Sequence, residues 1–404
     1  MFQNLSQNGC SVWVTSSTEL ALTPTVIALG KFDGVHRGHQ RVIEPILKLQ
    51  EENNEKVEQQ EQYDSSRLEK KPAIGGFPQK NILPKQVTDL REQSIEQGDF
   101  SARYSLSLPN INQVENTIPP AIASSTEYIY STVVTFNPHP QEFFTGKTHT
   151  LLTPVDEKSQ QMRSLGVEQL VLLPFDKELC ALTPEEFVEK ILVQQLQCRK
   201  ISVGQDFRFG SNRSGTAKDL QSIAARYDIP VIIVPLQVCS EELSIHSSYE
   251  RISSSLIRQH LERGEVEQAN QLLGRPYNLV GPVIKGQQLG RTIGFPTANL
   301  HVPKQKFLPR LGVYAVRVKN LGEASDVTAA DYLGVMNIGC RPTVNGTYTS
   351  VEVHLLDWTG DLYCKKLIVQ LEKFLRPEQK FPSLEALKTQ IYQDCNAARA
   401  FFGG

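Results

Sequence analysis

The stretch TVIALGKFDGVHRGHQR, residues 25–41, decides the fold class of the first part of this chain. It opens with a continuous apolar run, which is typical of a strand buried on both faces of a sheet. Gly30 and Gly34 then lead into a helical pattern. A helix that starts after a glycine turn offers unpaired backbone N–H groups and a positive dipole end to a phosphate. Because His36 and His39 add donors at the same point, we interpret the stretch as a phosphate site rather than as a turn with incidental histidines.

Strand and helix patterns alternate downstream of this stretch. Continuous apolar runs predict buried strands at 131–136, 169–175, 200–204 and 230–236. Helical patterns fall at 39–52, 183–196 and 216–227. Thr183, Pro184 and Glu186 form a capping-box signature at the start of the second helix. This alternation predicts an α/β fold with a doubly wound parallel sheet.

The character of the chain changes after residue 280. Short, often alternating segments separated by Gly, Pro and Asn predict a small antiparallel β-barrel, and 383–402 has the pattern of a closing amphipathic helix. We therefore expect one domain at 1–274 and a second at 275–404. Residues 53–127 are polar and glutamine-rich, and we expect a disordered surface insertion there rather than a small lid or partner-binding segment.

Composition bounds the cellular setting and the partners. The chain has 404 residues, 40% of them hydrophobic and 21% charged, with a formal net charge of −2. That balance argues against general binding to nucleic acid or to an acidic membrane. The seven cysteines are widely spaced without a C-x-x-C pair, which favours the reducing cytoplasm over a disulfide framework or a zinc site. We expect no signal peptide and no membrane span, which needs roughly 18 apolar residues, and a homo-oligomer stays open.

Three other segments carry polar side chains that suit a nucleotide site. In RISSSLIR, Ser254 and Arg258 are four residues apart, so both can lie on one side of a helix and hold the β- and γ-phosphates. A plain capped helix is the alternative. TFNPHP places Asn137 and His139 just beyond a strand, at the edge where parallel sheets bind ligands. VGQDFRFG, residues 203–210, follows a later strand, and its aromatic residues either frame a planar ring or belong to the core.

Two segments of the expected barrel carry candidate chemistry. In LGRTIGFPTANL, Thr297 and Asn299 point the same way on an extended segment and offer oxygen ligands for Mg²⁺ bound to substrate phosphates, with a structural turn as the alternative. In VEVHLLDW, Glu352 shares a face with His354 and Leu356. We expect that face to point into the barrel, where Glu352 would act as general base toward a hydroxyl or pair with a buried cation.

Together these motifs resemble the bacterial bifunctional riboflavin kinase/FAD synthetase family, and the resemblance covers the chain outside roughly 53–127. It rests on GKFDGVHRGHQ, TFNPHP, VGQDFRFG, RISSSLIR, LLGRPYNLVGPV, GRTIGFPTANL, GVYAV, MNIGCRPTVNG, VEVHLLDW and FLRPEQKF, in the family's order. The resemblance implies a Rossmann-like nucleotidyltransferase of the HIGH type followed by a riboflavin kinase barrel. It also implies two steps that use ATP and Mg²⁺: riboflavin is phosphorylated to FMN, and FMN is adenylylated to FAD with release of pyrophosphate.

The resemblance also assigns residues. The catalytic positions would be His36, His39, Arg258 and Glu352. The ATP and phosphate contacts would be Gly30, Phe32, Asp33, Gly34, Ser253, Ser254, Gly290, Thr297 and Asn299, the last two also holding Mg²⁺. The flavin contacts would be Asn137, His139, Asp206, Phe207 and Arg376. The chain departs from the family pattern at Asn137, where an acidic residue is frequent, at Ser255, where Thr is common, and at Cys364, where Gly is usual. The expectation that both modules are active has two alternatives. In the first, one module is active and the other is degenerate. In the second, the protein binds flavin without turnover.

Overall fold

The computed structural model describes residues 12–47, 128–238, 251–286, 289–320, 331–343 and 346–403. The insertion expected at 53–127 lies outside these residues.

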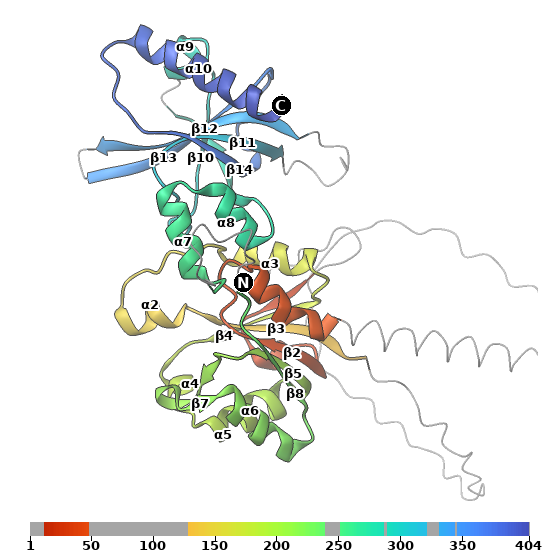
Figure 1. The fold of residues 1–404 in the computed structure, drawn as a ribbon. Coiled ribbons are helices and arrows are strands. Elements are labelled where there is room, and N and C mark those ends of the chain that lie inside the picture. The colour runs from red at the N-terminus through yellow and green to blue at the C-terminus, as the bar shows by residue number, and fades with distance from the viewer. Residues whose placement is uncertain are drawn as a thin grey trace, which may run out of the picture. The chain divides into compact units, whose positions relative to one another are not determined.

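The first part of the fold is a six-stranded parallel sheet (Figure 1). Its strands are β1 (Trp13–Thr15), β2 (Thr25–Leu29), β3 (Tyr130–Asn137), β4 (Gln169–Pro174), β5 (Cys198–Gly204) and β8 (Val231–Val234). The order across the sheet is β1-β4-β3-β2-β5-β8, and every pairing is parallel. The chain extends from β2 through β3 to β4 and then returns to place β5 on the other side of β2. This change of direction creates the crevice in which open parallel sheets bind ligands.

Helices cover both faces of this sheet, which confirms the doubly wound prediction. The helix over 37–47 and α3 (Val155–Ser164) pack on one face, and η2 (Phe187–Gln195), which continues the short α5 (Pro184–Glu186), packs with α6 (Ala217–Ala224) on the other. The capping box at Thr183 is confirmed, because its hydroxyl accepts from the Glu186 N–H and the Glu186 carboxylate accepts from the Thr183 N–H. Short elements complete this part: η1 (Thr18–Leu20), α2 (Pro140–Thr145), α4 (Lys177–Ala181), β6 (Arg208–Phe209), η3 (Ser211–Arg213), β7 (Gly215–Thr216) and η4 (Ala225–Tyr227).

The second part is a closed antiparallel barrel, as predicted. Its strands are β9 (Tyr277–Ile284), β10 (Ala298–Leu300), β11 (Gly312–Asn320), β12 (Tyr332–Thr343), β13 (Gly346–Leu355) and β14 (Lys366–Pro377), in the order β10-β13-β12-β11-β14-β9. The short helix α9 (Leu289–Thr292) lies between β9 and β10 in the sequence. Two helices, α7 (Ser254–Arg263) and α8 (Val266–Leu273), precede the barrel, and their buried apolar side chains belong to the same hydrophobic cluster as the barrel core.

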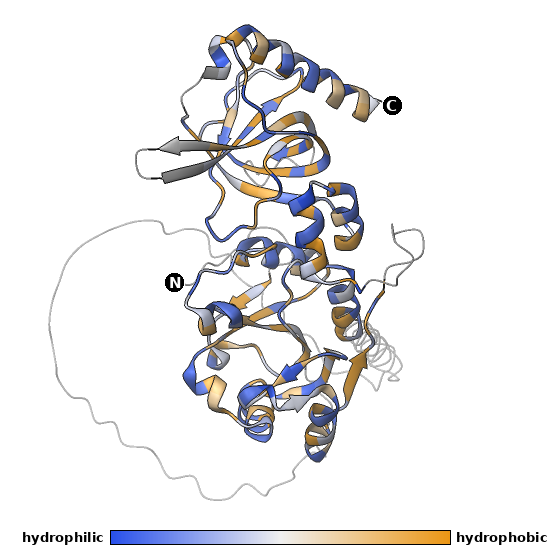
Figure 2. Cartoon of the chain, turned by 60° about the vertical axis from the view of Figure 1, so that its left-hand side comes forward, coloured by the Kyte–Doolittle hydropathy of each residue, from blue (hydrophilic) through white to orange (hydrophobic). Residues whose placement is uncertain are grey.

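The C-terminal helix α10 (Leu384–Gly403) covers part of the outer surface of the barrel. It alternates hydrophobic and hydrophilic bands along its length (Figure 2). Its Cys395 and Ala398 pack against outward-facing residues of the barrel, among them Val313 and Ala315 of β11. Its Asp394 forms a bidentate pair with Arg376 of β14, and both of the joining hydrogen bonds measure 2.8 Å. A bidentate arginine–carboxylate pair fixes orientation as well as distance.

Cys364 stands where the family usually has glycine, and the backbone explains that preference. Its φ is 63°, in the left-handed region that L-residues other than glycine rarely adopt. We therefore expect Cys364→Gly to raise the free energy of unfolding by about 0.5–1 kcal/mol, measured by urea denaturation. Cys340→Gly is the matched control, because Cys340 is an exposed residue inside β12 and should lose stability. Equal losses in both variants would contradict the argument.

Candidate functional site

The two histidines of the opening stretch lie together at the start of a helix. Helical structure begins at residue 37, two residues earlier than expected, because the His36 side chain caps it. The Nδ1 atom of His36 accepts the backbone N–H of His39 at 3.2 Å. The two imidazole rings then stack with their centroids 3.6 Å apart. The motif therefore presents a pair of parallel rings at a helix N-terminus, where backbone N–H groups and the helix dipole favour an anion.

Gly38 explains the spacing of the H-x-G-H motif. A Cβ atom added at this position would lie 3.2 Å from two atoms of the His36 ring, closer than nearly all real Cβ contacts. Only glycine lets the His36 ring fold back over the first turn and reach its partner. Beneath the pair, the buried ring of Phe32 meets His39 edge-on at 5.3 Å. Phe32 has a φ of 48°, so a residue held in an unfavourable conformation supports the site.

Both histidines are neutral at pH 7. Burial lowers the pKa of His36 to about 4, and burial lowers that of His39 well below its usual value. Because Nδ1 of neutral His36 is an acceptor, its Nε2 carries the hydrogen and can donate. Nδ1 of His39 is buried and has no hydrogen-bond partner in the described part of the chain. A buried polar atom without a partner is costly, which indicates that a ligand completes this site.

The lowered pKa of His36 predicts acid sensitivity. Unfolded histidine binds a proton near pH 6.5, whereas folded His36 does so only near pH 4, so stability falls as pH drops through this window. Between about pH 7.5 and pH 5, His36 alone should remove roughly 2 kcal/mol from the free energy of unfolding, measured by urea denaturation. His36→Asn keeps a capping acceptor but cannot titrate, so its loss should be smaller by that amount. An identical pH dependence in the two proteins would refute the assignment.

Asp33 joins the histidine loop to the start of α7. Its Oδ2 accepts from Nη2 of Arg258 at 2.6 Å, and its backbone carbonyl accepts from the Ser254 hydroxyl at 2.7 Å. Ser254 and Arg258 thus lie on one side of α7, as their spacing predicts, and the structure brings both to Asp33 of the histidine loop. Ser253 caps α7 by accepting the N–H of Leu256 at 3.2 Å. The N-terminus of α7 therefore faces the same loop as the two histidines.

The predicted roles of Gly30 and Gly34 need a qualification. The N–H of Gly30 donates to the Val134 carbonyl at 3.1 Å, and the N–H of Gly34 donates to the Thr153 hydroxyl at 2.9 Å. Both N–H groups are engaged within the protein, so these glycines shape the loop instead of offering free donors. Arg275, which the sequence did not single out, donates to the Gly34 carbonyl at 2.7 Å and to the Val35 carbonyl at 3.1 Å. The loop is thereby held from both sides.

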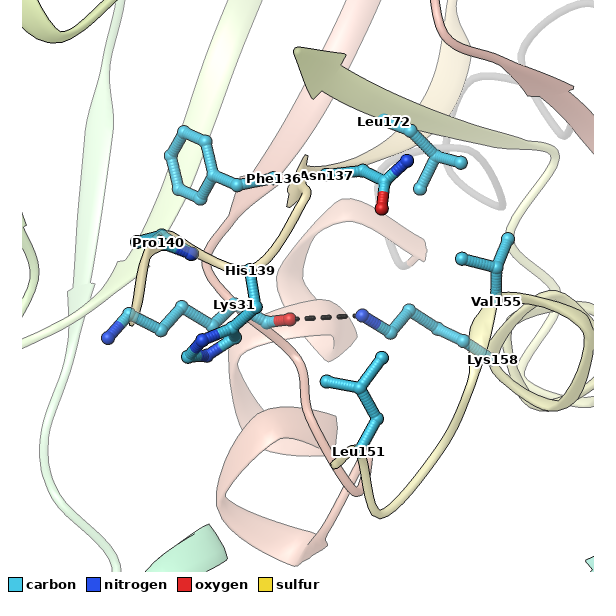
Figure 3. A pocket seen from close by; sticks show the side chains of 9 residues that line it. All are labelled: Lys31, Phe136, Asn137, His139, Pro140, Leu151, Val155, Lys158 and Leu172. Atoms are coloured by element: carbon cyan, nitrogen blue, oxygen red, sulfur yellow. Dashed lines mark hydrogen bonds between the residues drawn. The ribbon is translucent and has the colours of Figure 1, made fainter. Parts of the chain in front are cut away.

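A pocket opens at the carboxyl edge of the sheet, beside the histidine loop. Figure 3 shows its lining: Lys31, Phe136, Asn137, His139, Pro140, Leu151, Val155, Lys158 and Leu172. His139 caps α2 through Nδ1, which accepts the N–H of Gln141 at 3.2 Å, and its ring stacks on His149 at 4.3 Å. Burial lowers the pKa of His139 to about 4. Asn137 and His139 therefore lie at the ligand edge of the sheet, as expected.

The 203–210 segment divides between surface and core. Asp206 is exposed and forms an ion pair with Arg251, at the beginning of the RISSSLIR motif. Phe209 is buried and packs against Phe187 in the hydrophobic core. Phe207 stacks on Phe209 at 5.7 Å and is only half-buried. Of the two aromatic side chains, Phe209 belongs to the core, and only Phe207 retains a surface that could meet a planar ring.

The expectation that Glu352 points into the barrel is wrong. Its neighbours Val351 and Val353 are buried in the barrel core, and since side chains alternate along a strand, Glu352 points outward. The predicted alternation with His354 was correct, but the apolar positions rather than the acidic one fill the interior. Register pairs Glu352 with Asn299 of β10 on one side and with Asn337 of β12 on the other. Three polar side chains therefore form a row on the outer surface.

Two glycines leave room beside this row. A Cβ atom at Gly286 would lie 2.3 Å from the amide of Asn299, and one at Gly290 would lie 3.2 Å from the hydroxyl of Thr297. The backbone passes close to both side chains, which only glycine allows. Thr297 and Asn299 supply oxygen atoms of the kind that Mg²⁺ prefers when it is also bound by phosphates. In the described ranges, no three His, Cys, Asp or Glu side chains form a metal site by themselves.

Arg376 stands in the same transverse row, paired with Val313 of β11. Its guanidinium is occupied by Asp394 of α10, as described above, and lies 5.6 Å from the ring of Phe381. The structure thus shows a residue that anchors the closing helix. Its predicted contact with a flavin stays a prediction.

Two buried cations were missed at the sequence level. Lys158 of α3 and Lys306 are each under a tenth exposed. Lys158 lies in a polar helix and Lys306 lies outside the helices and strands, and neither sequence pattern distinguishes burial from exposure, so only the fold could identify them. Lys306 pairs with buried Glu157 and also donates to the Leu152 carbonyl at 2.7 Å.

The fold divides into an α/β module with a parallel sheet and a closed antiparallel barrel, and comparison with known families gives the same division. The family model for FAD synthetase matches residues 18–58 and 121–249, and the model for riboflavin kinase matches residues 273–402. The expected boundary at 274 stays a prediction, since neither model covers 250–272.

Relatives that contain both modules identify the family. The bifunctional riboflavin kinase/FMN adenylyltransferase of Escherichia coli K12 is 40% identical over 272 residues, which cover 67% of this chain and 82% of the relative. Those of Listeria monocytogenes and Bacillus subtilis are 36% and 34% identical over similar shares, 68% and 67% of this chain and 83% and 82% of theirs. This chain belongs to the bifunctional riboflavin kinase/FMN adenylyltransferase family.

A solved structure supports the fold over almost the whole chain. The crystal structure of a Streptococcus pneumoniae protein named for macrolide efflux has a TM-score of 0.65 and 25% identity, and the match covers 96% of this chain and 98% of the other. Among the residues that the structure describes here, no helix has the length and apolar character needed to cross a membrane.

Proposed function

We propose that the polar clusters described above carry the two activities of the family, with FMN made on the barrel and adenylylated at the histidine loop. Riboflavin kinase activity resides in the C-terminal barrel and FMN adenylyltransferase activity in the N-terminal sheet, as the family models and the bifunctional relatives support. The substrates are riboflavin, FMN and ATP, and FMN and FAD are the products. The observation that carries the residue assignment is the stacked, neutral pair His36 and His39 at a helix N-terminus.

In adenylyl transfer, a phosphate oxygen of FMN attacks the α-phosphorus of ATP and pyrophosphate leaves. The attacking phosphate is already largely deprotonated at pH 7, because its second pKa is about 6, so this step needs no general base. It needs donors that stabilise the charge on the α-phosphoryl oxygens. His36 and His39 donate as neutral imidazoles, while Ser254 and the α7 N-terminus hold the β- and γ-phosphates. Arg258, fixed by Asp33 at 2.6 Å, positions the loop and completes this grip.

The kinase step has a different chemical demand. The nucleophile is a ribityl hydroxyl, which must lose a proton as it attacks the γ-phosphate of ATP. Glu352 is the carboxylate of the outer row and is our proposed base. Its cross-strand partner Asn299 and the nearby Thr297 would hold Mg²⁺ with the ATP phosphates. Bound there, Mg²⁺ would neutralise charge on the transferred phosphoryl group.

The remaining assignments rest on sequence. Asn137, His139, Asp206 and Phe207 are the proposed flavin contacts of the adenylyltransferase, and Arg376 that of the kinase. We propose a cytoplasmic location from the cysteine pattern, no nucleic-acid or membrane partner from the charge balance, and leave a homo-oligomer open.

One incubation tests the function. The purified chain is mixed with riboflavin, ATP and Mg²⁺, and the flavins are separated by chromatography. Successive FMN and FAD peaks support both activities, and a parallel reaction with excess EDTA should stop both. FMN alone would leave only the kinase, and flavin binding without turnover would reduce the protein to a flavin binder.

A further inference from the structure

Lys158 is a buried cation that faces the pocket at the carboxyl edge of the sheet. Its side chain extends from α3 toward the loop after β2, and its Nζ donates to the Lys31 carbonyl at 3.2 Å (Figure 3). Only 5% of the residue is exposed. An ammonium group has three donors, and across the described ranges this is the only hydrogen bond of the Lys158 ammonium group. Burial lowers the pKa of Lys158 and the charge of Asp33 acts against that shift, but no carboxylate forms an ion pair with the ammonium group in the described ranges. Because lysines are rarely buried without such a pair, an anion in the pocket would stabilise this charge.

Lys158 lies between the two parts of the proposed adenylylation site, the histidine loop and the pocket beside it. Its positive charge contributes to lowering the pKa of His39, on the triphosphate side, and that of His139, on the pocket side. It shares the pocket lining with Lys31, Asn137 and His139. Because Lys158 lines the pocket and bonds the loop that leads to His36 and His39, it lies where we propose that the α-phosphate of ATP and the phosphate of the acceptor meet.

The reaction itself supplies the missing anion. Two negatively charged phosphates have to approach each other, and their repulsion must be offset before the new P–O–P bond forms. The neutral histidines donate hydrogen bonds but bring no charge, and the guanidinium of Arg258 is committed to Asp33. The Lys158 ammonium group has further N–H donors, and its bond to the Lys31 carbonyl already holds it at the pocket.

We infer that Lys158 binds the phosphate of FMN at the adenylyltransferase site and distinguishes FMN from riboflavin as the acceptor. Riboflavin lacks this phosphate and would leave the ammonium group unpaired, so it gains nothing from the contact. The inference rests on the proposed function and adds to it a residue whose positive charge selects the phosphorylated acceptor.

The test measures FAD formation from supplied FMN and ATP by the full chain and two variants. Lys158→Gln keeps an N–H for the Lys31 carbonyl but removes the charge, and Lys158→Arg keeps the charge. We expect Lys158→Gln to raise KM for FMN at least tenfold with KM for ATP changed less than threefold, and Lys158→Arg to restore most of the loss. Riboflavin phosphorylation by the same variants should be unchanged. Lys218→Gln, on the exposed surface of α6, is the matched control.

The outcomes separate the two levels of the argument. If the unaltered chain forms no FAD, the proposed function fails. If it forms FAD and Lys158→Gln leaves KM for FMN unchanged, or raises both KM values equally, only the role of Lys158 is refuted. Because KM does not depend on the fraction of folded enzyme, a destabilised variant still reports it. Failure of both variants to fold would assign Lys158 a structural role and would also refute the inference.

Discussion

Replacement of His39 by alanine is expected to stop the conversion of riboflavin at FMN. The change removes one of two stacked donors, and with it the ring that Phe32 contacts edge-on. Loss of one preorganised donor to a developing phosphoryl charge typically lowers a rate by about 10²–10³-fold, and loss of the stacked pair should place the effect at the upper end. The measurement is the initial rate of FAD formation from FMN and ATP, with riboflavin phosphorylation followed in the same preparation.

His301→Ala is the control for this experiment, because His301 is exposed and lies in the segment that precedes β11. It should leave both rates within about twofold. Retention of more than a tenth of the adenylylation rate by His39→Ala would contradict the proposed role. A parallel fall in kinase rate would indicate a folding defect rather than a lost phosphate contact.

The second large effect is expected for Glu352→Gln, which should strongly slow riboflavin phosphorylation while supplied FMN is still converted to FAD. The substitution keeps the size of the side chain and its place in the row beside Asn299 and Asn337, but removes the basic oxygen. General base catalysis contributes about 10²–10⁴-fold, so the kinase rate should fall by that range. The measurement is FMN formation from riboflavin, ATP and Mg²⁺.

Glu372→Gln serves as the matched control, since Glu372 of β14 is also a strand carboxylate and pairs with Arg317 on the barrel surface. Its kinase rate should remain within about threefold of the unaltered chain. A normal rate of FMN formation by Glu352→Gln would remove Glu352 as the base and leave Thr297 and Asn299 to act through positioning and Mg²⁺ alone.

Local patterns predicted the elements of the fold well, for physical reasons. The parallel strands are buried on both faces, so their apolar runs are continuous and easy to recognise. The helix start at Thr183 was also recognisable, because the capping hydrogen bond is made by the Thr183 side chain itself. The three residues of β1 were missed because a strand that short has no periodicity to detect.

Orientation was harder to predict than element type. Alternation along β13 indicates that Glu352 and His354 share a face, but it does not say which face is enclosed when the barrel closes. That depends on the partner strands, whose apolar residues meet Val351 and Val353 inside. The pairing of Asp33 with Arg258 was likewise invisible, since it joins positions 225 residues apart. The separate motifs were recognisable, whereas the contacts that turn them into sites come from tertiary structure.

The hold of Arg275 on the histidine loop bears on how this enzyme could be divided for separate use. A fragment that stopped at residue 274 would contain the whole sheet, yet it would lack the guanidinium that bonds the Gly34 and Val35 carbonyls. It would also lack Lys306, the counter-charge of Glu157. The Val35 carbonyl would keep its bond from the Gln40 side chain at 3.0 Å, whereas the Gly34 carbonyl would lose the guanidinium donor. A buried acceptor without a partner costs about 1–3 kcal/mol. A fragment made for adenylylation alone should therefore extend beyond Arg275, so that the histidine loop keeps this contact.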